Sequence, residues 1–342
     1  MKLLVFTDNH FCENFSIVQG QGEKYTTRIE NQLASISWIE DLAIQKGCDA
    51  VFCLGDFFDK ADLTEQEITA TKDIRWNDLP HYFLVGNHES DTNGLRFSST
   101  KILEAENRKI ISEPSKQMFG SCEICFLPYI IESDRKPLLE YFGPMTDTPR
   151  IIFSHNDLKG IQMGPVVSKI GFDLEEIKTT CTLFLNGHLH NGQKVSENAI
   201  NLGNLTGKDF GEDATRYKHY AVIIDTETLN CELIENPHAF NFYKLEVNTL
   251  EDIANLSNLK QNSVLSIKCK DSLVSELRSQ INKLSDRIIN SRIIITREAT
   301  EDGEEGDISE LTMDHLVKFV ECCRKEINNT EALEIELAEI CK

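Results

Sequence analysis

The chain has 342 residues, more than one ordinary domain contains, so we expect one large domain and a smaller one. Its formal net charge of -21 argues against a broad, autonomous nucleic-acid surface, because such surfaces need clustered Lys and Arg. The 11 cysteines follow no repeating pattern, and the apolar runs are shorter than a signal peptide or a membrane span, which predicts a cytoplasmic protein without membrane contact.

The first part of the chain alternates short apolar runs with amphipathic segments, an order typical of layered α/β packing. The expected strands are residues 2–6, 50–54 and 82–85. The expected helices are residues 26–46, 64–75 and 97–106. Shorter apolar segments then predict a more antiparallel stretch at residues 109–111, 116–119 and 123–128.

The middle of the chain resumes this pattern after a predicted helix over residues 133–142. The predicted strands are residues 150–153 and 182–185, followed by β-hairpin patterns at 198–202, 219–225 and 230–235. Cys122 and Cys125 form a C-x-x-C pair, but no second pair matches it. We therefore interpret these two cysteines as strand residues and not as metal ligands.

The last hundred residues differ in composition from the rest. We expect a large domain over residues 1–238 and a small α/β module over 239–298, with strands at 242–247, 263–268 and 291–296 and helices at 250–256 and 271–284. An acidic linker at 299–309 has nothing apolar to bury. Two amphipathic helices are predicted within 310–342, a segment that could dock on a partner or fold back on the small module.

Polar groups follow five of the apolar runs. Because the carboxyl ends of parallel strands meet at one edge of a sheet, we expect these side chains to lie together. A lone Asp-x-His or Gly-Asp pair is more often an ordinary loop or turn, but five such junctions in order predict a metal site. The predicted ligands are Asp8, His10, Asp56, Asn87, His155, His188 and His190.

This ligand set favours two divalent ions. Asp56 is the predicted bridge, because two neighbouring cations need a shared anionic oxygen. Asp8 and His10, two residues apart, share a face and are assigned to the first ion, and His188 and His190 divide between the two. Oxygen and nitrogen donors without thiolate suit manganese, iron or zinc. Such a pair of ions binds and hydrolyses phosphate esters.

His88 has a different predicted role. It directly follows the ligand Asn87, and Asp59 lies about one turn beyond Asp56. A histidine paired with a carboxylate beside a metal site is well placed to protonate a leaving alkoxide. We therefore predict His88 and Asp59 as catalytic residues. The remaining histidines, His81, His219, His238 and His315, are interpreted as ordinary core or surface residues.

Over residues 1–235 the chain resembles the calcineurin-like metallophosphoesterase superfamily. The resemblance rests on Asp8-x-His10, Gly55-Asp56-x-x-Asp59, Gly86-Asn87-His88-Glu89, His155 and Gly187-His188-x-His190. It implies an α/β (α+β) fold in which a β-sandwich is flanked by helices, together with two divalent metal ions.

Within this superfamily the chain most resembles the SbcD-type DNA repair nuclease subunit, including the small subunits of phage recombination endonucleases. Residues 201–205 and 209–212 are similar to the Gly-Ser and Phe-Gly-Glu stretch of that family. The resemblance implies manganese as cofactor, DNA as substrate, a homodimer, and an SMC-like coiled-coil ATPase partner of the SbcC type. The small module is then a capping domain, and residues 310–342 are helices that dock on the ATPase.

Two departures bear on this prediction. The segment 11–17 lacks a further histidine that nuclease members often carry after Asp-x-His. Many phosphatase members place Arg where this chain has Lys60. The alternative function is a phosphatase or cyclic-nucleotide phosphodiesterase of the same superfamily, and a non-catalytic scaffold is a third possibility that the intact ligand set disfavours.

Overall fold

The computed structural model describes residues 1–13, 18, 20–90, 97–163 and 166–296. The predicted acidic linker and the two predicted amphipathic helices within 310–342 lie outside the described residues.

Two six-stranded sheets form the main body. The first has the order β14-β13-β1-β2-β3-β4, from β1 (Lys2–Phe6), β2 (Ala50–Cys53), β3 (His81–Leu84), β4 (Arg108–Ile111), β13 (Tyr220–Asp225) and β14 (Cys231–Glu235). The second has the order β11-β12-β10-β7-β6-β5, from β5 (Ser115–Phe119), β6 (Cys122–Leu127), β7 (Arg150–Ser154), β10 (Leu183–Asn186), β11 (Gln193–Lys194) and β12 (Ala199–Asn201). Two short strands, β8 (Gln162–Met163) and β9 (Val166–Val167), pair with each other.

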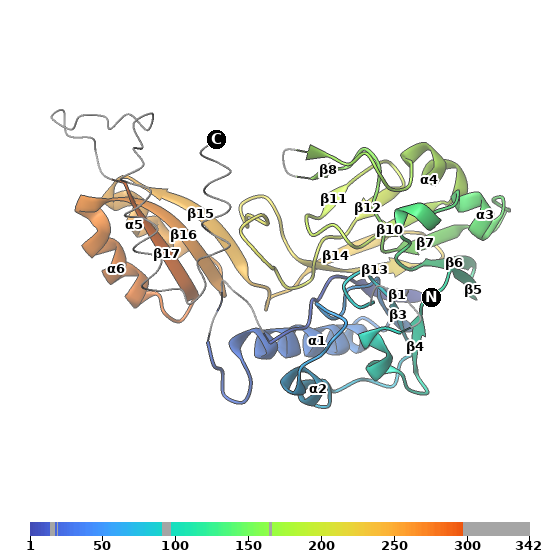
Figure 1. Cartoon of the computed structure of the whole chain (residues 1–342), viewed down its shortest axis with the longest axis horizontal. Coiled ribbons are helices and arrows are strands. Elements are labelled where there is room, and N and C mark those ends of the chain that lie inside the picture. The colour runs from blue at the N-terminus through green and yellow to red at the C-terminus, as the bar shows by residue number, and fades with distance from the viewer. Residues whose placement is uncertain (14–17, 19, 91–96, 164–165, 297–342) are drawn as a thin grey trace, which may run out of the picture. The chain divides into compact units, whose positions relative to one another are not determined.

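The two sheets pack face to face, and helices cover their outer faces (Figure 1). Side chains that alternate along β1, β2, β6 and β7 fill the space between the sheets. The other face of the first sheet packs on α1 (Thr27–Gln45) and α2 (Glu65–Thr71). The outer face of the second packs on α3 (Leu138–Phe142) and α4 (Leu174–Thr180). The predicted β-sandwich flanked by helices is confirmed.

Helix α1, the longest of the described helices, shows how the spacing of apolar residues packs a helix on the first sheet. Thr26 accepts a hydrogen bond from the Ile29 N–H and so caps the amino end of α1. Ile29, Ile36 and Ile39 recur at helical spacing and are fully buried against the first sheet. Burying each of these side chains contributes about 1.5–3 kcal/mol relative to leaving it exposed.

Several predicted elements are shorter or differently built. The helix expected over 97–106 is a 3₁₀ turn at Ser99–Leu103. The helix expected over 133–142 is divided into a 3₁₀ turn at Glu132–Asp134 and α3, because Pro137 disfavours helical backbone in the residue before it. Only β13 and β14 form the predicted hairpin, whereas β12 joins the second sheet beside β10.

Residues 241–296, here called the small module, form a separate three-stranded parallel sheet. Its strands are β15 (Asn241–Val247), β16 (Ser263–Lys270) and β17 (Ile288–Thr296), connected by α5 (Leu250–Asn255) with the 3₁₀ turn Leu256–Asn258, and by the 3₁₀ turn Asp271–Leu273 with α6 (Val274–Lys283). Tyr243 and Val247 are buried and Lys244 and Glu246 are exposed, as the alternation predicts. The module buries a core of its own.

Cys122 and Cys125 lie in β6, as predicted. Cys122 faces the core between the sheets, whereas Cys125 faces the core under α3 and α4. Because they point to opposite faces of one strand, they cannot hold the same ion. Burial raises the pKa of the Cys125 thiol to about 12, which keeps it protonated.

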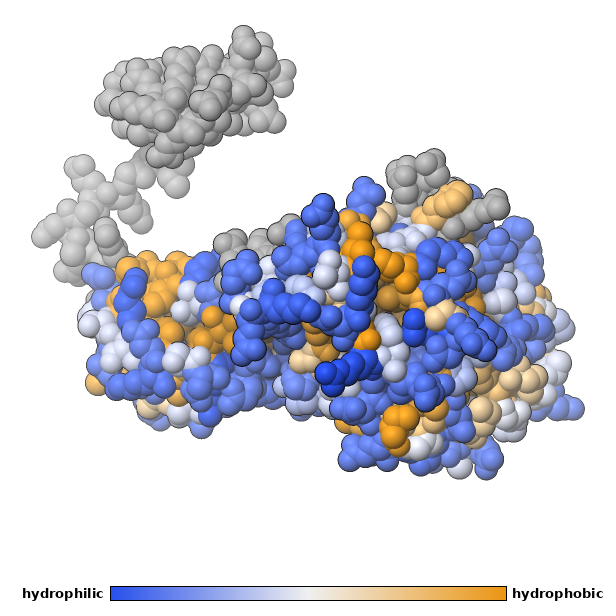
Figure 2. Space-filling model, turned by 90° about the horizontal axis from the view of Figure 1, so that it is seen from below, coloured by the Kyte–Doolittle hydropathy of each residue, from blue (hydrophilic) through white to orange (hydrophobic). Residues whose placement is uncertain are grey.

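The surface of the described residues is mostly hydrophilic in the view of Figure 2, with apolar side chains in separate patches. Exposed apolar side chains include Ile294 and Ile295 of β17 and Leu139 of α3. None of the described helices is long and apolar enough to cross a membrane.

Arg150 is a buried cation that we expect to be essential for stability. Its Nε donates to Glu123 Oε2 at 2.7 Å, and its two terminal nitrogens donate to the carbonyls of Phe142, Gly143, Pro144 and Thr180. Arg150→Met should lower the free energy of unfolding by about 3–5 kcal/mol, because it leaves these carbonyls without the guanidinium donor and Glu123 without its buried partner. Lys116→Met is the matched control, since Lys116 pairs with the same carboxylate but is half exposed. Equal losses in urea unfolding for both variants would contradict this role.

Candidate metal centre

The five predicted junctions lie at one edge of the sandwich. Strands β1, β2 and β3 are parallel neighbours, and so are β7 and β10, so their carboxyl ends point the same way within each sheet. The loops after them bring together three overlapping groups of possible ligands. The first group is Asp8, His10 and His190, and the second is Asp56, His155 and His188. His88 forms a third group with His10 and Asp56.

The backbone at these ligands is unusual. Asp8, His10, Asp56 and His188 all have positive φ angles, of 52°, 48°, 48° and 73°. Left-handed backbone at several non-glycine residues is uncommon and gathers at functional sites, where the surrounding structure maintains it. The loops also need glycine, because a Cβ on Gly86 would lie 2.1 Å from Asp56 Oδ1.

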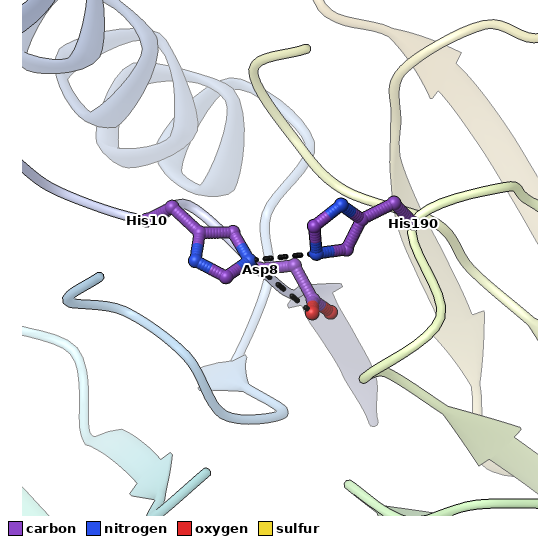
Figure 3. A group of neighbouring side chains, drawn as sticks. All are labelled: Asp8, His10 and His190. Carbon is purple, nitrogen blue, oxygen red and sulfur yellow. Dashed lines mark hydrogen bonds and ion pairs between the residues drawn. The ribbon is translucent and has the colours of Figure 1, made fainter. Parts of the chain in front are cut away.

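The first group surrounds a point between two imidazoles and a carboxylate (Figure 3). His10 Nε2 lies 2.9 Å from His190 Nε2 and 3.8 Å from Asp8 Oδ1. Asp8 Oδ1 is buried and has no hydrogen-bond partner among the described residues. A buried carboxylate oxygen and two facing nitrogens are satisfied together by a cation between them.

The second group lies next to the first, at the same edge of the sandwich, where the His188 N–H donates to Asp8 Oδ2 at 3.0 Å. His155 Nε2 is 3.1 Å from Asp56 Oδ2 and 3.3 Å from Asn87 Oδ1, and His188 Nδ1 is 2.8 Å from Asn87 Oδ1. Asn87 and Asp56 come from the first sheet, whereas His155 and His188 come from the second. The second group therefore needs both sheets.

Asp56 lies between the two groups. Its Oδ2 is 3.1 Å from His155 Nε2 of the second group and 4.0 Å from His10 Nε2 of the first. Its other oxygen accepts the His88 backbone N–H at 3.0 Å, which fixes the orientation of the carboxylate. This placement fits the predicted bridging role.

In His10, His190 and His155, one ring nitrogen makes a contact that fixes the orientation of the ring. The other ring nitrogen can then face a metal ion. His10 Nδ1 lies 2.9 Å from Asp59 Oδ1, His190 Nδ1 lies 3.1 Å from Glu212 Oε1, and His155 Nδ1 donates to the Leu54 carbonyl at 2.8 Å. Such partners fix the tautomer and the orientation of metal-binding histidines. His188 is held in the same way by Asp157, 3.3 Å from its Nε2.

Buried groups of opposite charge determine the protonation of the centre. Burial alone would lower the pKa of His155, but the carboxylates of Asp56 and Asp8 outweigh it and raise this pKa to about 9. Burial opposes ionisation of Asp56, yet His155 and His10 lower its pKa to about 2. The carboxylates are therefore charged at neutral pH, and a cation can take the place of the protons that the imidazoles hold.

His88 and Asp59 are neighbours, but not in the expected way. His88 Nδ1 donates to the backbone carbonyl of Asp59 at 2.9 Å, and the Asp59 carboxylate lies farther away, at 3.8 Å. That carboxylate instead contacts His10 Nδ1 and Lys208 Nζ, the latter at 2.8 Å. The His88 side chain is 37% exposed, and the Asp59 backbone carbonyl fixes the orientation of its ring. The Asp59 carboxylate instead orients the predicted ligand His10.

Four residues of the centre were missed as functional residues: Glu89, Asp157, Lys208 and Glu212. Buried Glu89 accepts hydrogen bonds from the N–H groups of Gly86 and Phe58 and so ties two of the ligand loops together. The sequence signals for these residues were slight. Glu89 and Asp157 each lie two residues from a predicted ligand, and Glu212 stands in the Phe-Gly-Glu stretch without an assigned role.

The donor set suits the divalent ions that the fold implies. When bound, two such ions would provide Lewis-acid stabilisation of phosphoryl oxygens and would acidify water. Asp8, His10 and His190 would hold one ion, and Asn87, His155 and His188 the other, with Asp56 shared.

Glu212 offers a test of the outer part of the centre. Besides His190, its carboxylate accepts from Asn204 Nδ2 and from the Lys208 N–H, each at 2.8 Å. Glu212→Gln removes the charge and turns one acceptor into a donor, so we expect metal affinity to fall about 10- to 100-fold. Isothermal titration with Mn²⁺ measures this, with Glu235→Gln as control at a carboxylate that pairs with Lys218 and Lys260. Unchanged affinity would remove Glu212 from the centre.

Comparisons with known proteins identify solved structures that align with most of the chain. A search of curated proteins finds no match. The aligned structures include an archaeal phosphodiesterase (14% identity, TM-score 0.36, 69% of this chain and 99% of that one) and the protein TT1561 of Thermus thermophilus (13%, 0.40, 68% and 98%). A dimetal phosphatase from Danio rerio aligns with 12% identity and a TM-score of 0.36, over 65% of this chain and 91% of that one.

The family model described as calcineurin-like phosphoesterase matches residues 1–218. This span includes all seven predicted ligands and both predicted catalytic residues. The chain therefore belongs to the calcineurin-like phosphoesterases, a family of metal-dependent phosphoester hydrolases.

Proposed function

We propose that this protein is a manganese-dependent DNA exo/endonuclease subunit of the SbcD type, which hydrolyses phosphodiester bonds together with an SMC-like ATPase. The observation that carries the proposal is the small module. The family match ends at residue 218, whereas the described chain continues into a separately built sheet that contacts the segment next to the metal centre.

Residues 204–214, here called the linking segment, connect the metal centre with the small module. The segment contributes Lys208 and Glu212 to the centre. On its other side the Ala214 N–H donates to the Phe242 carbonyl at 2.7 Å, the Phe240 N–H donates to the Thr206 carbonyl at 3.0 Å, and the Phe210 and Phe242 rings are in contact. A substrate that touched both the module and the centre would therefore be longer than a small phosphate ester.

The charge of the small module supports a polyanionic substrate. Although the whole chain has a net charge of -21, residues 241–296 contain eight Lys and Arg against six Asp and Glu. Lys and Arg side chains supply the sequence-independent part of nucleic-acid binding, because they neutralise phosphates. The basic residues are Lys244, Lys260, Lys268, Lys270, Arg278, Lys283, Arg287 and Arg292.

The residues of the centre would act on the phosphodiester as follows. The outer partners Asp59, Glu212 and Asp157 keep the imidazoles in the tautomers that leave one nitrogen available. His88, held at Nδ1 by the Asp59 carbonyl, presents Nε2 for proton transfer to the leaving oxygen. Burial lowers the pKa of His88, and a bound phosphate anion would raise it again by adding negative charge beside the ring.

The test compares three substrates in Mn²⁺: duplex DNA with free ends, bis(p-nitrophenyl) phosphate and p-nitrophenyl phosphate. We expect cleavage of DNA and of the chromogenic diester, with little hydrolysis of the monoester. Purified Asp56→Ala protein must lose the DNA cleavage, which excludes a contaminating nuclease. Efficient monoester hydrolysis by a protein that leaves DNA intact would overturn the proposal in favour of a phosphatase.

The partner is tested by deletion. Residues 308–342 lie outside the described residues, and the proposal assigns them to ATPase docking. Deleting them should leave a metal-loaded protein that cleaves DNA weakly alone and no longer co-purifies with the ATPase. A truncated chain that aggregates, or melts far below the full chain, would show that these residues belong to its own core.

A further inference from the structure

Lys208 is a cation at the metal centre with no part in the roles described so far. Its Nζ lies 2.8 Å from Asp59 Oδ1 and 3.4 Å from His10 Nδ1. His88 Nδ1 donates to the Asp59 carbonyl and lies 3.8 Å from the same Oδ1, so the ammonium group and the His88 ring both contact Asp59. The Lys208 side chain is 24% exposed, so solvent can reach it.

The backbone of Lys208 is fixed from both sides. Its own N–H donates to Glu212 Oε2 at 2.8 Å, and buried Arg28 donates to the Gly207 carbonyl at 2.8 Å. Gly207 has a φ of 71°, and a Cβ there would lie 2.3 Å from the Phe240 carbonyl oxygen. Glycine is therefore needed at this point, and the turn that it permits places Lys208 beside Asp59 and His10.

The ion pair with Asp59 uses only part of the hydrogen-bonding capacity of the Lys208 ammonium group. An ammonium has three N–H donors. Because His10 Nδ1 directs its proton to Asp59 Oδ1, 2.9 Å away, it cannot also accept one from Lys208. Among the described contacts, Asp59 Oδ1 thus accepts one of the three Lys208 N–H groups. The other two N–H groups can donate to a bound ligand.

We propose that Lys208 binds a non-bridging oxygen of the scissile phosphodiester and stabilises the negative charge that grows there during hydrolysis. A phosphodiester is an anion, and hydrogen bonds between two charged groups are the stronger ones. Charge on the phosphoryl oxygens increases toward the transition state, so a fixed cation beside them favours that state over the ground state. The proposal rests on the proposed function only for the identity of the substrate.

Lys60, by contrast, is a lysine whose ammonium group is held in an ion pair with a buried carboxylate. It follows Asp59 directly, yet its Nζ lies 3.2 Å from Glu67 Oε1 of α2, and Glu67 is fully buried. Breaking that pair would leave a buried charge without its partner. Of these two lysines beside the centre, Lys208 is the one whose partner, Asp59, is itself 28% exposed.

The test measures DNA binding and its salt dependence for Lys208→Gln in manganese, in a His88→Ala background that slows cleavage. Fluorescence anisotropy with a labelled single-stranded oligonucleotide should show affinity lower by about 10- to 100-fold, the worth of one charge-assisted hydrogen bond. The slope of log affinity against log salt should shrink by about 0.7, the share of one phosphate contact on a single strand. Lys208→Arg should keep the slope, and the control Lys218→Gln, at a surface pair with Glu235, should change neither quantity.

A purely structural role gives a different result. If Lys208 only neutralises Asp59, Lys208→Gln will lower the melting temperature or the manganese content while the salt slope stays at the parent value, and the proposal is then wrong. Failure of the proposed function is recognised separately. The unmutated chain would then cleave only bis(p-nitrophenyl) phosphate. In that case, the role of Lys208 is supported if Lys208→Gln lowers kcat/KM on this diester by about 10- to 100-fold, which corresponds to a hydrogen bond of about 1.5–3 kcal/mol. An unchanged kcat/KM refutes the role of Lys208.

Discussion

Replacing Asp56 by alanine should remove both metal ions from the centre. Asp56 Oδ2 is the oxygen that lies near His155 of one group and His10 of the other, so its loss deprives both groups of their shared anionic ligand. We expect DNA cleavage to fall by more than the roughly 100-fold that removal of an outer partner causes. Metal analysis after dialysis measures the occupancy, and circular dichroism reports whether the fold is retained.

A second variant separates loss of charge from loss of fold. Asp56 has a φ of 48°, which asparagine tolerates better than alanine does, so Asp56→Asn preserves the shape of the loop. It should lose the metal pair as Asp56→Ala does, because a neutral amide oxygen is a poor bridge. Asp62→Asn, at an exposed position in the same loop, should retain both ions. Two full equivalents in either Asp56 variant would refute the bridging assignment.

His88→Ala should separate binding from chemistry. His88 contacts the centre through its backbone N–H to Asp56, which alanine keeps, and through a ring that the Asp59 carbonyl holds. Metal occupancy and DNA affinity should therefore be unchanged, whereas turnover on DNA should fall by about 10²–10⁴, the usual contribution of a positioned general acid.

The leaving group provides the control for this variant. The alkoxide released from DNA needs a proton, whereas p-nitrophenolate is a stable anion that leaves without one. Hydrolysis of bis(p-nitrophenyl) phosphate should therefore fall much less than DNA cleavage does. Equal losses on the two substrates would mean that His88 acts on metal or substrate binding, and near-normal DNA turnover would remove it from the mechanism.

The clustering of the predicted ligands could be foreseen from the sequence because each of them follows a buried strand. The apolar runs before Asp8, Asp56 and His155 fix where each strand ends, and parallel pairing then carries these ends to a common edge. The β-sandwich was predicted from the family resemblance and is confirmed, and in it the side chains that alternate along β1 and β7 fill two different cores. Strand periodicity is a local signal, and it sufficed to place the ends of these strands.

The outer partners could not be found in this way. Glu212 contacts His190 only because the linking segment folds next to the centre. No local sequence pattern around either residue predicts this contact. Asp59 was assigned to His88 from proximity along the chain, but the turn directs its carboxylate to His10 and Lys208. Side-chain direction in a loop depends on tertiary contacts that periodicity does not report.

Manganese stoichiometry of the unmutated protein tests the central claim most directly. After equilibrium dialysis against Mn²⁺, the account predicts two equivalents for each chain and an electron paramagnetic resonance spectrum with the exchange coupling of two ions that share a bridging ligand. A single equivalent, or two equivalents whose spectra show no coupling, would contradict a centre built around Asp56.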